Sequence, residues 1–179
     1  MKAKISDGSD NTSKKSANNE RIKITPEMLK DGTVLCGLVL RFINNRNQEN
    51  MFSLLSCLRD SNVFVPCEVN MNGSDLEIGG RGDNPVMFPV HHKMTIKPQL
   101  YKATNGNVYM PFYTRQENAK PSQLKDASLI NLPYMQLVDM LHDNESCSGF
   151  VADPLLYNVV LDEDLVRIST ELPSRLARS

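Results

Sequence analysis

The segment Val63-Phe64-Val65-Pro66-Cys67-Glu68-Val69 alternates in a way that constrains the fold more than any other feature. In an extended strand successive side chains point to opposite faces, so Val63, Val65, Cys67 and Val69 share one apolar face. The stretches before it have a helical period instead. Apolar residues recur largely at three- and four-residue spacing between positions 28 and 43, and an apolar stripe runs from 51 to 58. The order therefore predicts two helices followed by a strand.

Local signals refine these elements. Thr25-Pro26 is a helix start, because Thr caps the first turn and Pro fits the first helical position. Gly32 and Gly37 weaken the helical pattern, which leaves open whether the first helix begins at Pro26 or after Gly32. Pro66 has no N–H to donate to a neighbouring strand, so it predicts a sheet edge or a bulge.

The later elements alternate between strands and helices. Residues 94–101 and 108–114 predict a hairpin across Thr104-Asn105-Gly106-Asn107, since Asn-Gly is a strong turn signal. Residues 128–132 form a short extended piece, Pro133 opens a helix, and 149–153 and 157–161 are short strands before a helix capped by Asp162. We expect an α+β fold, with a mixed β-sheet of about five strands, two N-terminal helices and two later helices packed on it.

The domain boundaries follow from composition. Residues 1–24 are nearly free of apolar side chains and are expected to form a disordered tail. Residues 25–175 are expected to form a single domain with one long loop at 70–92. Loops of this length in a compact domain are usually functional or disordered.

Several of these segments resemble the SseB protein N-terminal domain family, which takes its name from the enhanced serine sensitivity protein. Residues 50–66 are similar to the family's opening helix and its strand ending in Val-Pro. Gly106-Asn-Val-Tyr-Met-Pro-Phe-Tyr-Thr114 is similar to its Gly-to-Pro strand. The helix from Pro133, the strand Gly149-Phe-Val-Ala-Asp-Pro154 and the closing segment from Val160 follow in the family's order. The insert from Gly79 to Pro89 has no clear counterpart.

The resemblance covers roughly residues 34–172. It implies an α+β or α/β fold and a bacterial cytoplasmic setting. The matching motifs are structural rather than catalytic, so the resemblance implies little about activity and is compatible with a regulatory or accessory role.

Charge and composition exclude several classes of partner. The formal net charge of the 179 residues is −1, which gives no long-range field to attract nucleic acid or an anionic membrane. The N-terminus has no apolar signal region, and the longest apolar stretch is far shorter than the ~20 residues of a membrane span. Cys36, Cys57, Cys67 and Cys147 lie mostly in apolar patterns typical of free, buried thiols. We expect a cytoplasmic protein that binds neither nucleic acid nor membrane.

The sequence predicts no catalytic residue, no metal site and no cofactor. His91 and His92 are adjacent, so in an extended segment they point to opposite sides and rarely hold one ion. A cysteine–histidine pair would need His91, His92 or His142 to fold onto Cys67 or Cys147. With four cysteines and three histidines, such pairings also arise by chance. We therefore expect that the chain is not an enzyme.

The predicted binding residues are Phe64, Tyr109, Tyr113 and Arg115. Pro66, Pro98 and Pro111 interrupt successive strands, which indicates an irregular sheet with an aromatic, partly exposed face. Tyr and Arg are favoured at protein interfaces, although the same aromatics could line the core under the helices. The sequence favours a non-catalytic protein-interaction or regulatory module whose partner is another protein. The alternatives are an immunity protein that neutralises a toxin, and a small-molecule sensor or enzyme with a pocket near the 70–92 loop.

Overall fold

The structure is a computed structural model that describes residues 25–70, 76–79, 86–89, 95–124 and 126–174. The predicted tail at 1–24 lies outside these residues. The six helices of the described chain are α1 Pro26–Lys30, α2 Thr33–Asn44, α3 Gln48–Asp60, α4 Pro121–Leu124, α5 Tyr134–His142 and α6 Glu163–Glu171. Its strands are β1 Asn62–Asn70, β2 Leu76–Gly79, β3 Val86–Pro89, β4 Thr95–Pro98, β5 Tyr101–Lys102, β6 Val108–Phe112, β7 Ser128–Pro133, β8 Gly149–Ala152 and β9 Val159–Asp162.

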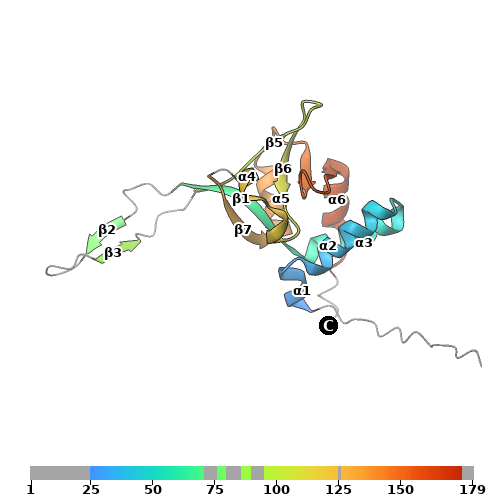
Figure 1. Ribbon diagram of the computed structural model, residues 1–179, viewed down its shortest axis with the longest axis horizontal. Coiled ribbons are helices and arrows are strands. Elements are labelled where there is room, and N and C mark those ends of the chain that lie inside the picture. Colours follow the sequence, from blue (N-terminus) through green and yellow to red (C-terminus); the bar gives the residue numbers. More distant parts are fainter. Residues whose placement is uncertain (1–24, 71–75, 80–85, 90–94, 125, 175–179) are drawn as a thin grey trace, which may run out of the picture.

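The strands form two main sheets that meet at one bridge (Figure 1). One sheet has the order β4-β1-β7 and the other the order β5-β6-β8-β9. Phe64 and Tyr113 exchange two backbone hydrogen bonds of 2.9 and 2.8 Å, which connect β1 to the end of β6. Across this bridge the strands stand in the order β7-β1-β6-β8-β9, with a parallel pair at β6–β8 and antiparallel neighbours elsewhere. The predicted α+β fold is confirmed.

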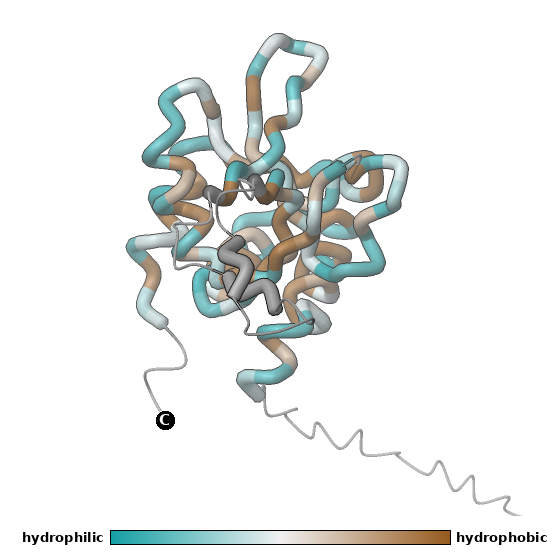
Figure 2. The backbone as a smooth tube through the Cα atoms, turned by 90° about the vertical axis from the view of Figure 1, so that its left-hand side faces the viewer, coloured by the Kyte–Doolittle hydropathy of each residue, from teal (hydrophilic) through white to brown (hydrophobic). Residues whose placement is uncertain are grey.

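One face of this sheet carries the hydrophobic core. Val63, Val65 and Cys67 of β1 are fully buried there, as the alternation predicted. They pack with apolar residues of β6, β8 and β9 and with helices α2, α3, α5 and α6. Figure 2 shows the apolar stretches of the backbone gathered toward the inside of the molecule. The opposite face, which we call the outer face, carries the alternate residues Phe64, Pro66 and Glu68 of β1.

The predicted helix starts are confirmed. The Thr25 side chain accepts a hydrogen bond from the Met28 N–H, with Pro26 in the first turn. The Asp162 side chain accepts from the Leu165 N–H at the start of α6. A helix begins at each of the two starts considered for the first helix: α1 begins at Pro26 and ends at Lys30, and α2 begins at Thr33. Gly32 separates them with a φ of 76°.

Three local predictions are wrong. Pro66 lies in β1, which is the central strand of its sheet. Its carbonyl accepts from the Gln99 N–H at 2.8 Å just beyond the end of β4, so the missing N–H of Pro66 lies where the regular pairing with β4 stops. Residues 94–101 do not form one hairpin strand, because β4 pairs with β1 and only β5 pairs with β6. The segment 70–92 is not all loop, since β2 and β3 pair within it and lie away from the main body in Figure 1.

Candidate functional site

A hollow of about 480 Å³ lies on the outer face of the sheet. Three prolines from separate parts of the chain line it, and we call it the proline hollow: Pro66 of β1, Pro111 of β6 and Pro154, which follows β8. The rest of its lining is Glu68, Gln99, Leu100, Tyr101, Tyr113, Ser122, Gln123 and Leu155. The sheet positions these residues by alternation, because every second residue of β1 and β6 points away from the core.

The side of the hollow near α4 is held by glutamine side chains. Gln123 of α4 donates from Nε2 to the Pro154 carbonyl at 3.3 Å and accepts from the Lys120 N–H at 2.9 Å. Gln99 donates from Nε2 to the Leu124 carbonyl at 3.1 Å, and its backbone N–H donates to the Pro66 carbonyl at 2.8 Å. The walls are therefore connected by hydrogen bonds across four segments of the chain.

The other side of the hollow is the turn at residues 153–158, which is anchored by the buried carboxylate of Asp153. One carboxylate oxygen accepts from the Thr114 N–H at 2.9 Å and from Asn118 Nδ2 at 3.0 Å, and the other accepts from the Thr114 hydroxyl at 2.7 Å. Burial raises the pKa of Asp153, which outweighs the lowering by these donors. The Asp153 carbonyl accepts from the N–H groups of Leu156, Tyr157 and Asn158, which closes the turn.

Leu155 projects from this turn in an unusual state. Its φ is 62°, a left-handed conformation that bulky residues rarely adopt, and 66 % of its surface is exposed. The Asn158 side chain accepts from the Leu155 N–H at 2.9 Å and helps to hold this conformation. Leu100, which also lines the hollow, is 45 % exposed. Two leucines thus offer apolar surface to solvent at the hollow.

In the structure the four predicted binding residues do not form the expected exposed patch. Tyr113 lines the proline hollow but exposes only 3 % of its surface, and Tyr109 exposes 7 %. The expectation of exposed aromatics is therefore wrong for both tyrosines, although neither belongs to the core under the helices. Phe64 is half-buried in the bridge to Tyr113. Arg115 pairs with Glu117 at 3.2 Å and does not line the hollow.

Burial also affects the Tyr113 hydroxyl. Its pKa is raised first by burial and then by the charge of Asp153. The hydroxyl therefore stays protonated at neutral pH, where it lies 3.5 Å from Gln123 Oε1. Tyr113 consequently forms an apolar floor of the hollow with one polar atom, its protonated hydroxyl.

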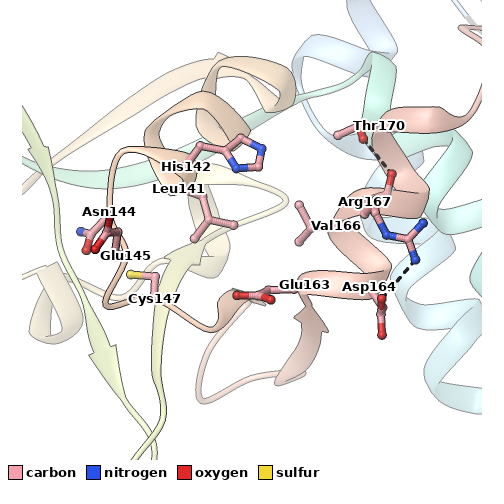
Figure 3. Close-up of a pocket in the computed structure, with 10 residues that line it drawn as sticks. All are labelled: Leu141, His142, Asn144, Glu145, Cys147, Glu163, Asp164, Val166, Arg167 and Thr170. Atoms are coloured by element: carbon pink, nitrogen blue, oxygen red, sulfur yellow. Dashed lines mark hydrogen bonds and ion pairs between the residues drawn. The ribbon is translucent and has the colours of Figure 1, made fainter.

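A second hollow, of about 570 Å³, lies between the end of α5 and α6 (Figure 3). It is lined by His142 and Cys147, one of the cysteine–histidine pairings considered from the sequence. The Cys147 sulfur and the His142 ring point in different directions in Figure 3, and no hydrogen bond joins them among the described residues. Burial raises the pKa of the Cys147 thiol, so it is not activated as a thiolate. This arrangement lacks the contact between nucleophile and base that catalysis requires.

The remaining predictions concern metals, thiols and membranes. The described residues contain no group of three or more His, Cys, Asp or Glu residues placed to hold a metal ion, and His91 and His92 lie outside them. All four cysteines are buried thiols that form no disulfide, as predicted. Among the described helices, none has the length and apolar character needed to cross a bilayer.

Comparison with known proteins identifies the family. Comparisons with curated proteins and with solved structures found no match. The family model of the SseB protein N-terminal domain matches residues 39–167, which is more than half of the chain and lies within the segment that the sequence motifs indicated. The chain therefore belongs to the SseB N-terminal domain family.

Proposed function

We propose that this chain is a non-catalytic protein-interaction module with a regulatory role in the bacterial cytoplasm, and that a partner protein docks at the proline hollow. The observation that carries the proposal is Leu155, which is exposed and held with a positive φ beside the hollow. The four buried cysteines, none of which forms a disulfide, support a reducing compartment.

In the isolated chain, the left-handed conformation of Leu155 costs free energy that no burial of its side chain offsets. A left-handed backbone at a residue other than glycine costs about 1–3 kcal/mol, and such strain tends to occur where function requires it. The exposed side chain gains no burial. A partner that covers Leu155 and Leu100 would supply the missing burial, because the Asp153 turn already holds the leucine in place.

The chemistry of the proline hollow supports binding more than catalysis. Its only ionisable groups are Glu68 and the hydroxyls of Tyr101 and Tyr113, among the residues described there. They include no histidine, cysteine or second carboxylate to complete an acid–base or nucleophilic pair. Tyrosine, proline and leucine together form the mixed apolar and polar lining typical of protein interfaces.

The experiment is photo-crosslinking in the native host with the tagged full chain. A photoreactive amino acid replaces Leu155 in one version and Leu40, a leucine of α2 that is 40 % exposed, in the matched control. We expect one partner protein to be crosslinked from position 155 and not from position 40. Co-purification of that partner should fall by about ten-fold or more with Leu155→Asp, as expected when a leucine loses its burial, and should persist with Leu40→Asp.

The outcomes separate the proposed function from its alternatives. A partner that still co-purifies with Leu155→Asp would place the interface elsewhere and refute the docking surface. If the chain instead retains a metabolite and no protein, the alternative of a small-molecule sensor or enzyme would take the place of the interaction-module proposal. A crosslinked partner that is a toxin inhibited by the chain would identify an immunity protein, which uses the same surface in a different role.

A further inference from the structure

Glu68 gives the proline hollow a single charge. Its side chain lies on the outer face of β1, two residues beyond Pro66, and is exposed. Among the described residues that line the hollow, it is the only one charged at neutral pH. The described part of the chain provides no ion pair or hydrogen bond for its carboxylate.

Among the cations in the described part of the chain, Lys97 stands opposite Glu68 in the antiparallel register of β1 and β4. Lys97 does not line the hollow and makes no ion pair with Glu68. The carboxylate therefore remains available to a ligand that enters from solvent. A hollow that combines apolar surface with one carboxylate at its side complements a ligand that is apolar at one end and cationic at the other.

The surroundings of Glu68 define the rest of the ligand. Leu100 and Leu155 flank the opening with exposed apolar surface, and the proline rings and Tyr113 form an apolar interior. The volume of about 480 Å³ falls within the range of about 300–1,000 Å³ that holds small ligands or a few side chains. A whole folded surface does not enter such a space, whereas an anchor residue of a peptide segment does.

We infer that the partner docks through a segment in which a large apolar side chain stands next to a lysine or arginine. The apolar side chain enters the proline hollow between Leu100 and Leu155, and the cation reaches the Glu68 carboxylate. This inference rests on the proposed function and adds the chemistry of the partner to it. Recognition of this kind needs no movement of the sheet, since the hydrogen bonds of Gln99 and Gln123 already hold the walls.

The test uses short random peptides displayed on phage and selected on the immobilised full chain. Four versions are compared: wild type, Glu68→Lys, Leu155→Asp, and the control Glu163→Lys, which changes an exposed glutamate at the second hollow. Wild type and the control should enrich peptides in which a large apolar residue adjoins a basic one. Glu68→Lys should keep the apolar preference and replace the basic residue with an acidic one, and Leu155→Asp should enrich nothing.

A selected peptide then gives the strength of the contact by fluorescence anisotropy. Glu68→Gln should weaken its binding by about two- to five-fold, the range of a solvent-exposed ion pair. Salt screens exposed charges, so this difference should shrink in concentrated salt. The variant Glu163→Lys should bind the peptide as wild type does.

The outcomes distinguish the inference from the proposed function. If the peptides selected on wild type show no preference for a basic residue but are lost with Leu155→Asp, the inference is overturned and the docking surface is still supported. Peptides that bind Leu155→Asp as well as wild type would refute the proline hollow as a docking surface, and the inference with it. A chain that associates with itself in solution, through a contact abolished by Leu155→Asp, would also overturn the inference, because a second copy would then be the occupant.

Discussion

Asp153 carries a buried carboxylate on a backbone that most residues avoid. It is fully buried, its φ is 47°, and its side chain accepts three hydrogen bonds from Thr114 and Asn118. Those donors are 39 and 35 residues away in the sequence, so this one residue connects β6 and the following turn to the end of β8. The position of Leu155 at the proline hollow depends on this connection.

Replacing Asp153 should test how much stability the connection supplies. Asp153→Ala leaves the buried Thr114 N–H and hydroxyl without their acceptors, so we expect a loss of about 2–4 kcal/mol in the free energy of unfolding. Asp153→Asn keeps the shape and tolerates the left-handed backbone, so its loss should be smaller. Urea unfolding of both variants measures the two losses. Equal losses would show that the amide of asparagine replaces none of the contacts made by the carboxylate.

The raised pKa of Asp153 also predicts that the free energy of unfolding depends on pH. Because the pKa of Asp153 is raised from its ordinary value of 3.8 in the folded chain, the folded state holds this proton more tightly than the unfolded state. Its contribution to the free energy of unfolding is therefore largest at low pH and falls as pH rises from 3.8 through the folded-state pKa. The stability advantage of wild type over Asp153→Asn should shrink across this window. An advantage that grows with pH would mean that the three donors dominate over burial.

The site was only partly predictable at this scale. Pro66, Pro98 and Pro111 could be selected from the sequence because they interrupt strands, and Tyr113 because tyrosine is favoured at interfaces. Of these four residues, Pro66, Pro111 and Tyr113 line the hollow and Pro98 does not. Leu155 was missed. An Asp-Pro-Leu-Leu segment after a strand indicates a turn, but which leucine is exposed depends on hydrogen bonds from Thr114 and Asn118 that the local sequence does not encode.

At the scale of elements, the start of α2 depends on a close approach that only glycine permits. Gly32 has a φ of 76°, and a Cβ atom added to it would overlap the backbone carbonyl oxygen of Thr114. Gly37 lies on the exposed side of the same helix, and a Cβ atom there would meet nothing within 4 Å. The two glycines therefore form a matched pair with opposite requirements.

Alanine at these positions should have effects of opposite sign. Gly32→Ala should destabilise the chain by about 2 kcal/mol or more, because it combines backbone strain with an overlap that backbone movement must relieve. Gly37→Ala should stabilise it by about 0.5–1 kcal/mol, because alanine loses less conformational entropy in a helix. Thermal unfolding followed by circular dichroism measures both. A stabilising Gly32→Ala would refute the close approach of α2 to Thr114.

Element type was more predictable from sequence than element pairing. Caps and periodicity depend on neighbours within a few residues, so the starts at Thr25 and Asp162 and the core face of β1 were predicted correctly. Residues 94–101 were assigned to one hairpin because their composition favours a strand. In the structure Gln99 lies between β4, which pairs with β1, and β5, which pairs with β6, and its hydrogen bonds go to Pro66 and Leu124, which are distant in sequence.

At the scale of the whole molecule, three aromatic rings connect the β5-β6-β8-β9 sheet to helix α5, which directly follows β7 of the other sheet. Phe112 of β6, Tyr134 of α5 and Phe150 of β8 pack edge to face, with ring centroids 5.6–6.4 Å apart. The Tyr134 hydroxyl lies 2.9 Å from the Ser169 hydroxyl of α6, which brings the last helix into the same cluster. Because the Phe64–Tyr113 bridge also joins the sheets, we expect residues 25–175 to unfold as one unit.

Phe150→Ala tests this expectation. The ring is fully buried, so its loss should lower the free energy of unfolding by about 3–5 kcal/mol, whereas Val160→Ala, a change in the neighbouring strand at a residue that is 44 % exposed, should cost about 0.5 kcal/mol or less. In native-state hydrogen exchange, the amides of β1 and β7 should lose as much protection as those of β8 and β9, because residues of both sheets pack in the same hydrophobic core as Phe150. Loss confined to β8 and β9 would instead show two units that unfold separately. The proline hollow, which takes residues from both sheets, would then depend on how those units dock and not on one folded domain.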